Sequence, residues 1–206
     1  MPASSANASP FKQPHNEQPR IVLASRSPRR QALLNGLGFT FEVQPADIDE
    51  TPQPHEQAYD LVTRLSASKA RAIAQHHPDA LIIAADTTVV LGEQFLEKPR
   101  DLAQKREFIS LLAGKPHTVL TGHAVAYGET LEQRTTSTQV YVRDLGEQEI
   151  DWYVSTGEGL DKAGGYAIQG HGAALVDRIE GCYFNVVGMS VATVFELCQN
   201  LGVPLV

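Results

Sequence analysis

The chain has 206 residues, and its 17 Lys and Arg against 24 Asp and Glu give a formal charge of −7. Such an acidic chain repels a polyphosphate backbone, which excludes bulk electrostatic binding of DNA, RNA or an anionic membrane surface. Hydrophobic residues make up 42% and charged residues 20%, a composition typical of a globular protein. Only a local basic site is expected to hold a phosphate group.

The N-terminal residues and the two cysteines indicate the domain organisation and the cellular compartment. Residues 1–19 contain four of the twelve prolines but neither a basic region nor an apolar run, so we expect a flexible tail rather than a signal peptide. Residues 20–206 are expected to form a single domain. Cys182 and Cys198 match no metal-ligand spacing and are too few for a disulfide framework, which favours a reducing, cytoplasmic location. No stretch is apolar for long enough to predict a membrane span.

The first ordered segment is predicted to be a strand, a turn and a helix. Residues 21–24 form a short apolar run typical of a buried strand. Ser27 then suits a helix N-cap and Pro28 the first helical position, with Gly36 or Gly38 as the stop. Residues 20–30 carry four arginines and no acid, so this stretch alone has a charge of +4.

A second helix is predicted over residues 56–75, and its lysine at position 69 is unusual. Leu61, Val62, Leu65 and Ile73 recur at helical spacing, and Lys69 falls inside the apolar arc that they define. Two interpretations remain open from the sequence. The lysine extends to solvent from the edge of the arc, or it points into a functional site.

Residues 81–91 give the strongest strand signal, and a carboxylate interrupts it. Asp86 closes the apolar run 81–85, which places it at the carboxyl end of a strand, where ligands of open α/β sheets gather. A buried carboxylate requires a partner or a cation. The alternative interpretation is a structural aspartate that caps the next turn.

The remaining chain is predicted to complete an α/β fold with an antiparallel portion. We expect a helix over 100–113, strands over 117–127 and 135–143 joined by a hairpin loop at 128–134, a helix over 147–156, a strand-like piece at 174–176 and a last helix near 190–200. Residues 161–170 are rich in glycine. They can bring backbone amides close to a ligand, although such segments are more often only turns.

These residues together suit phosphoryl chemistry. Ser25, Ser27 and the arginines of the turn offer hydroxyl, backbone and guanidinium donors to an anion. Lys69 and Lys98 add positive charge, and Glu50 and Asp86 can hold a divalent cation through oxygen. The acidic stretch around Glu50 can equally be a solvated loop. The sequence has no G-x-x-x-x-G-K-[ST] and no H-E-x-x-H, so neither a P-loop nor a zinc hydrolase is predicted.

Seven motifs resemble those of the Maf nucleotide pyrophosphatases, in order from about residue 20 to the C-terminus. They are SRSPRR at 25–30, DET at 49–51, SKA at 68–70, ADT at 85–87, EKP at 97–99, DKAGGYAIQG at 161–170 and NVVG at 185–188. The resemblance implies metal-dependent hydrolysis of a nucleoside triphosphate to a monophosphate and pyrophosphate. It also implies a mixed sheet with flanking helices and two lobes around a deep central cleft, similar to inosine triphosphatases. Met189-Ser190 departs from the usual Leu-Pro, which puts the start of the last helix in question.

The resemblance also implies roles for individual residues. Asp86 corresponds to the general base, and Arg29, Thr87 and Gln169 fall at positions that distinguish the branch acting on dTTP and UTP. Glu50, with Asp86, is an implied ligand of Mg²⁺ or Mn²⁺. The implied contacts to phosphate or base are Ser25, Ser27, Arg30, Lys69, Lys98 and Lys162.

A second hypothesis is a nucleotide-binding regulatory protein linked to septum formation, in which Asp86 serves binding without turnover. Either hypothesis requires a nucleoside triphosphate as the partner and neither requires a nucleic acid or a membrane. The family resemblance also implies that a homodimer is possible.

Overall fold

The computed structural model describes residues 19–206, so the predicted flexible tail lies almost entirely outside the described residues. The strands are β1 (Ile21–Leu23), β2 (Glu42–Val43), β3 (Leu81–Leu91), β4 (Gln94–Leu96), β5 (Pro116–Tyr127), β6 (Thr130–Val142) and β7 (Val176–Glu180). The α-helices are α1 (Pro28–Gly36), α2 (Ala58–Ala74), α3 (Leu102–Leu112), α4 (Glu147–Ser155), α5 (Tyr183–Val187) and α6 (Val191–Asn200). Two short 3₁₀ helices, η1 (Ala163–Gly165) and η2 (Gly170–Ala174), lie between α4 and β7.

All seven strands form one mixed sheet, which confirms the predicted α/β class. The order is β2-β1-β3-β5-β6-β7, and β4 pairs separately with β3. β2, β1 and β3 are parallel, whereas β3 pairs antiparallel with β5 and the sheet continues antiparallel through β6 and β7. The antiparallel portion predicted around residues 117–143 is therefore present.

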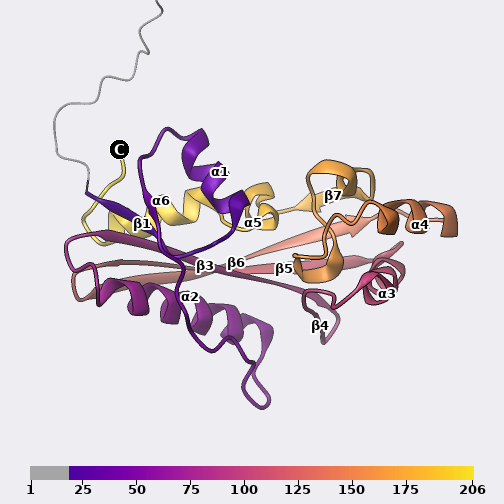
Figure 1. Ribbon diagram of the computed structural model, residues 1–206, viewed down its shortest axis with the longest axis horizontal. Coiled ribbons are helices and arrows are strands. Elements are labelled where there is room, and N and C mark those ends of the chain that lie inside the picture. The colour runs from indigo at the N-terminus through magenta and orange to yellow at the C-terminus, as the bar shows by residue number, and fades with distance from the viewer. Residues whose placement is uncertain (1–18) are drawn as a thin grey trace, which may run out of the picture.

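Helices cover both faces of the sheet. α2 lies along one face, while α1 and α6 lie on the other (Figure 1). Alternate residues of β3 serve the two faces. Leu81, Ile83 and Ala85 pack with α1 and α6 in one buried cluster, and Ile82 and Ala84 pack with the alanines of α2 in another. A third cluster joins α3 and α4 to the far end of the sheet.

β3 has an open edge in its middle. On one side, β1 pairs with residues 81–83 and β4 pairs with residues 89–91. On the other side, β5 pairs with β3 continuously from Ile82 to Val90. Within the described residues, the segment 84–88 therefore has a strand neighbour on the β5 side alone.

The sequence predicted the helices more accurately than the β6 hairpin. α2 and α4 match their expected ranges within about two residues, but β6 begins at Thr130 and the predicted loop over 128–134 is wrong. The actual turn consists of Gly128 and Glu129, and Gly128 adopts the positive φ of 57° that a tight hairpin requires. Residues 130–137 are polar apart from Leu131, and this part of β6 is half-buried or exposed, so the sequence shows no clear strand pattern there.

Two boundaries near the C-terminus also differ from expectation. Of the strand-like piece predicted at 174–176, Ala174 ends η2, Leu175 is its C-cap and only Val176 belongs to a strand, as the first residue of β7. α5 was not predicted at all, because five residues are too short for a helical periodicity. At the start of α6, the Ser190 hydroxyl accepts a hydrogen bond from the Thr193 amide, and Met189 is fully buried. This sequence therefore starts the helix with a serine cap in place of the usual Leu-Pro.

The described part of the chain contains no helix that is both long and apolar enough to span a bilayer.

Candidate active site

A pocket of about 510 Å³ lies at the open edge of β3. Its walls come from the turn before α1, the segment 45–50, α2, β3, the segment 161–169 and residues 186–188. Every site residue predicted from the sequence lines this one pocket: Ser25, Ser27, Arg29, Arg30, Glu50, Lys69, Asp86, Thr87, Lys98, Lys162 and Gln169. The structure thus brings together residues that are spread in the sequence from Ser25 to Gln169.

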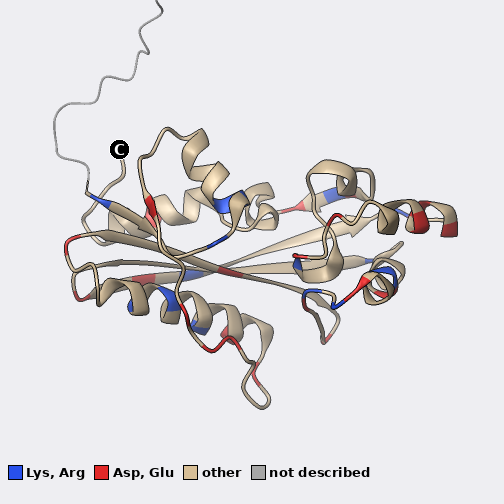
Figure 2. Cartoon of the chain, viewed as in Figure 1, with Lys and Arg blue, Asp and Glu red and all other residues tan. Residues whose placement is uncertain are grey.

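Asp86 and Thr87 reach the pocket from opposite faces of the sheet. Asp86 shares the face of Ile82 and Ala84, toward α2, while Thr87 shares the face of Ala85, toward α1. Both can line the same pocket because no strand of residues 19–206 pairs with β3 along that edge between β1 and β4. Lys and Arg occur on α1 and α2, which lie on opposite sides of β3 (Figure 2). The pocket therefore receives cationic groups from both faces.

The expectation that Asp86 closes a strand is corrected by the structure. β3 continues to Leu91, so Asp86 lies in mid-strand. The parallel neighbour β1, however, ends at Leu23, which pairs with Ile83. Asp86 therefore lies three residues beyond the point where the parallel pairing of β1 with β3 ends. Ligands of open α/β sheets gather at the carboxyl ends of strands, and here that end belongs to β1 rather than to β3.

Lys69 points into the pocket and joins two carboxylates. Its Nζ lies 2.7 Å from Asp86 Oδ1 and 2.9 Å from Glu50 Oε1. The side chains of Lys69 and Asp86 are only 10% and 14% exposed, whereas that of Glu50 is 52% exposed. Of the two interpretations of Lys69, the structure thus supports the second. The carboxylate of Asp86 receives the charged partner that a nearly buried acid requires.

The carboxylates of Asp86 and Glu50 are also candidate ligands of a divalent cation. No group of three or more His, Cys, Asp or Glu in residues 19–206 is arranged to hold a metal. Mg²⁺ commonly binds through one or two carboxylates and completes its shell with substrate phosphates and water. Asp86 and Glu50 fit that pattern, because Lys69 holds both of them on the pocket wall.

The turn before α1 is held by its own serines. Ser27 is the N-cap, and its hydroxyl accepts a hydrogen bond from the Arg30 amide at 3.5 Å. Ser25 Oγ accepts from the Ser27 amide at 3.2 Å and from Arg30 Nη1 at 2.9 Å. Pro28 occupies the first turn of the helix, as predicted. The two hydroxyls therefore shape the start of α1 as well as lining the pocket.

Arg30 is half-buried and joins three segments. Its guanidinium donates to the Gly188 carbonyl at 2.8 Å, to Ser25 Oγ, and to Thr87 Oγ1 at 3.1 Å. Burial lowers the pKa of Arg30 from its ordinary value, although the nearby Asp86 opposes that effect. Thr87 Oγ1 also lies 2.9 Å from Thr121 Oγ1 of β5. Arg30 and Thr87 thus fix the α1 side of the pocket to β3 and to residue 188.

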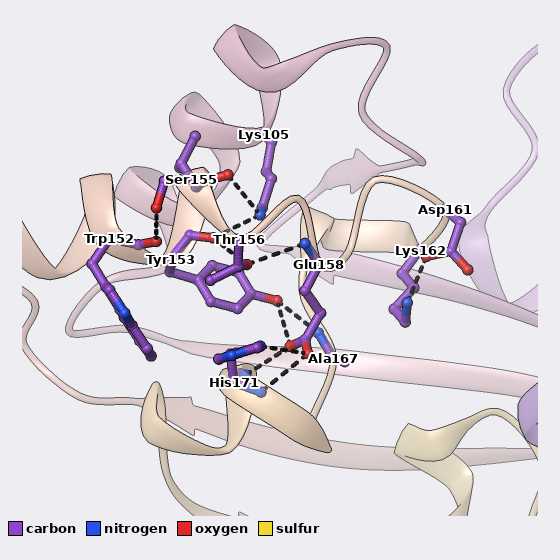
Figure 3. Close-up of polar contacts among 12 residues, drawn as sticks. Lys105, Trp152, Tyr153, Ser155, Thr156, Glu158, Asp161, Lys162, Ala167 and His171 are labelled. Carbon is purple, nitrogen blue, oxygen red and sulfur yellow. Dashed lines mark hydrogen bonds and ion pairs between the residues drawn. The ribbon is translucent and has the colours of Figure 1, made fainter.

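Arg29 and Lys162 meet across the pocket on one carboxylate. Arg29 Nη1 lies 3.3 Å from Asp161 Oδ2, and Lys162 Nζ lies 2.5 Å from Asp161 Oδ1, the latter contact visible in Figure 3. Burial raises the pKa of Asp161, but its bonds to Lys162 and Arg29 outweigh this and hold the pKa below its usual range. Asp161 was not among the predicted site residues. The only signal in the sequence was a charge beside a glycine-rich segment.

The last two predicted residues, Lys98 and Gln169, are exposed at the pocket wall. Lys98 follows β4, and Gln169 is the residue immediately before η2. The glycine-rich segment is therefore more than a turn, because it carries Lys162 and Gln169 to the pocket. Apolar side chains of Val89, Val119 and Val186 also line the pocket and place an apolar surface beside the charged groups.

Comparison with known proteins agrees with this site. Residues 20–201 match the family model described as Maf-like protein. A dTTP/UTP pyrophosphatase of Anaeromyxobacter dehalogenans is 47% identical over 91% of this chain and 96% of its own length. A dTTP/UTP pyrophosphatase of Deinococcus radiodurans is 45% identical over 92% of this chain and 97% of its own. Among solved structures, the Staphylococcus aureus Ham1 protein is 14% identical, with a TM-score of 0.44 over 61% of this chain and 72% of that one. The extent of the family match and these identities show that the chain belongs to the Maf family.

Proposed function

We propose that this protein is a nucleoside triphosphate pyrophosphatase that hydrolyses dTTP and UTP to the monophosphate and pyrophosphate. One observation carries the proposal: Asp86 faces a pocket lined with cationic side chains and is held there by Lys69 at 2.7 Å. Relatives at 45–47% identity over nine-tenths of the chain are named for the same reaction. The established family and the geometry of the pocket therefore support the same chemistry.

In the proposed reaction, Asp86 accepts a proton from water. The water oxygen forms a bond to one of the two phosphorus atoms that flank the α–β bridging oxygen, and the bond from that phosphorus to the bridging oxygen breaks. Attack on the α phosphorus expels pyrophosphate and attack on the β phosphorus expels the monophosphate, so both give the proposed products. Lys69 holds the Asp86 carboxylate in one orientation, which a base needs for efficient proton transfer. Arg29, Lys98 and Lys162 offset the charge that develops on the phosphate oxygens.

A divalent cation, Mg²⁺ or Mn²⁺, is part of this proposal. Glu50 and Asp86 would hold it together with the triphosphate, and it would supply further neutralisation of phosphate charge. Lys69 contacts both carboxylates, so it keeps them from repelling one another before the substrate binds.

We also propose that Arg29, Thr87 and Gln169 select the base. A carboxamide can both donate to and accept from the imide edge of thymine or uracil, whereas a purine is larger than the base that this pocket is proposed to enclose. Gln169 lies on the glycine-rich wall and Thr87 on the wall made by β3, so a base between them would contact both.

The experiment is a panel of triphosphates incubated with the protein and Mg²⁺ or Mn²⁺, with separate detection of pyrophosphate and orthophosphate. We expect dTTP and UTP to yield pyrophosphate and the monophosphate, with lower kcat/KM for CTP and for purine triphosphates. Release of orthophosphate would contradict the reaction type. Saturable binding of dTTP without any turnover would instead favour the regulatory hypothesis.

The remaining expectations concern the assembled protein. We propose a cytoplasmic enzyme whose pocket is the floor of a deep cleft between two lobes, and which forms a homodimer. Size-exclusion chromatography with light scattering would measure the mass in solution against the 22.4 kDa of one chain.

A further inference from the structure

Gln169 is at the N-cap position of η2, but its side chain does not cap the helix. An N-cap side chain commonly folds back onto the amides of the first turn. Here the carboxamide of Gln169 is not used in that way, so the amides of η2 must be satisfied by another group.

Glu158, in the turn that follows α4, supplies the missing cap. Its Oε2 accepts a hydrogen bond from the His171 amide at 3.0 Å, and its Oε1 accepts from the Gly172 amide at 2.8 Å. These contacts converge on the Glu158 carboxylate in Figure 3. Burial raises the pKa of Glu158, but the bonds from Gly172 and His171 outweigh it and lower the pKa overall. The group is therefore an ionised cap at neutral pH.

Tyr153 ties the other side of Gln169 to the same carboxylate. The Tyr153 hydroxyl donates to Glu158 Oε1 at 3.2 Å and accepts from the Ala167 amide at 3.2 Å. Residue 167 lies two positions before Gln169, and residues 171 and 172 follow it. The pair Tyr153–Glu158 thus fixes the backbone on both sides of Gln169 (Figure 3).

The pair is itself rigidly placed. Tyr153 is fully buried, and the Lys105 Nζ lies 4.3 Å from its ring centroid while donating to the Tyr153 carbonyl at 2.9 Å. Gly170 has φ +67°, and a Cβ there would lie 2.3 Å from Glu158 Oε2. The close approach of the cap therefore requires glycine directly after Gln169.

We infer that Glu158 is a positioning residue for Gln169: it caps η2 in place of the Gln169 side chain and so leaves that carboxamide to the base in the pocket. The inference rests on the proposed function. Glu158 lies outside the set of residues that line the pocket, so its effect on base selection runs through Gln169. Loss of the cap should then weaken recognition of the imide edge more than it slows the chemical step.

The test compares Glu158→Gln with the wild type on dTTP and CTP. CTP is the competitor, because cytosine is a single ring like thymine but lacks the imide N–H. A carboxamide at position 158 loses the negative charge that strengthens these hydrogen bonds. Its NH₂ group also replaces one acceptor oxygen with a donor, which cannot accept from a backbone amide. We expect kcat/KM for dTTP to fall on the order of ten-fold through a higher KM, the preference for dTTP over CTP to fall by a similar factor, and kcat to change less than about two-fold.

Glu149→Gln is the control variant. Glu149 also caps a helix, accepting from the Gly146 amide at 3.0 Å, and pairs with Arg143, but it is absent from the pocket lining. Its replacement should leave the preference for dTTP over CTP unchanged. Hydrogen–deuterium exchange adds a readout apart from activity: the amides of His171 and Gly172 should exchange faster in Glu158→Gln alone.

Each outcome decides something. Unchanged preference in Glu158→Gln, an equal loss in Glu149→Gln, or unchanged exchange at residues 171 and 172 overturns the inference while the proposed function stands. Absence of dTTP and UTP hydrolysis in the wild type overturns the proposed function and the inference with it. If Glu158→Gln does not fold, Tyr153→Phe removes the bond to Ala167 and should lower the preference in the same direction.

Discussion

Lys69 contributes to the site by holding one ammonium group between two acids. Its position in the apolar arc of α2 is what brings it to the face of β3 where Asp86 lies. The ion pairs with Asp86 and Glu50, which lie within 2.9 Å of its Nζ, offset the cost of removing the ammonium group from water. The three side chains therefore act as one unit, and changes in any of them are expected to be non-additive.

The first prediction concerns Asp86→Asn. The amide keeps the size of the carboxylate but accepts no proton from water, so kcat should fall by about 10²- to 10⁴-fold. Nucleotide binding should remain, because Arg29, Lys98 and Lys162 are unchanged. Steady-state release of pyrophosphate and calorimetric binding of dTTP measure the two quantities. A variant that keeps more than about a tenth of wild-type kcat would exclude Asp86 as the base.

At this scale the sequence predicted the site better than it predicted the supporting residues. Lys69 was detectable because a charge inside an apolar arc is unusual, and Asp86 because a carboxylate interrupted an apolar strand. Asp161 and Glu158 carry no such signal. Both lie in irregular segments, and their partners come from contacts between segments distant in sequence or from local loop geometry, which periodicity does not encode.

The placement of the helix α2 depends on one glycine. Gly122 of β5 pairs with Asp86 in the sheet, and a Cβ at position 122 would lie 2.1 Å from the Val62 carbonyl of α2. The helix therefore packs on bare backbone directly beside the proposed catalytic residue. Lys69 lies on the same helix, so the distance between α2 and β5 controls the Lys69–Asp86 contact.

Gly122→Ala should accordingly harm both stability and activity. Backbone atoms must move apart, and overpacking of this kind costs about 1–3 kcal/mol of unfolding free energy. Urea unfolding measures that cost, and kcat/KM for dTTP reports the displacement of Lys69.

Gly36→Ala is the matched control, because a Cβ there meets nothing within 4 Å and the residue is helical. It should be neutral or stabilising by up to about 1 kcal/mol. Equal effects of the two substitutions would contradict the argument.

Elements were predictable where the burial pattern was regular. α2, α4 and β3 have long periodic or apolar signals and were located within a few residues. The first half of β6 was missed because its polar residues resemble a loop, although backbone pairing with β5 defines it as a strand. The gap between β1 and β4 could not be foreseen, since it depends on how two short strands align along β3.

For the whole molecule, two histidines buried in β5 link stability to pH. The Ser190 amide donates to His123 Nε2 at 2.8 Å, so this nitrogen carries no proton. His117 is 2% exposed and contacts the Tyr166 hydroxyl at 2.6 Å. Burial lowers the pKa of each imidazole to about 4. Both therefore stay neutral in the folded protein.

Stability should then decline between pH 7 and pH 5. These histidines take up a proton near pH 6.5 in the unfolded chain but not in the folded chain. Each histidine therefore lowers the free energy of unfolding by about 2 kcal/mol between pH 7 and pH 5. Paired carboxylates such as Glu56, whose pKa Arg64 lowers to about 2, lose their contribution only at lower pH. Urea unfolding at pH 7 and pH 5 measures the decline. An unchanged free energy of unfolding, or NMR titration of the His117 and His123 imidazoles near pH 6.5 in the folded protein, would contradict it.

The open edge of β3 gives the nucleotide a structural role as well as a chemical one. The Ala24 amide donates to the Ile83 carbonyl at 2.8 Å, so the backbone groups of alternate residues, Ala85 and Thr87, face the gap. A ligand bound there would hydrogen-bond to the backbone groups that no strand pairs with between β1 and β4, within residues 19–206. Substrate binding should thus stabilise the folded protein at the unpaired stretch of β3. The melting temperature of the protein should rise when a non-hydrolysable dTTP analogue is added.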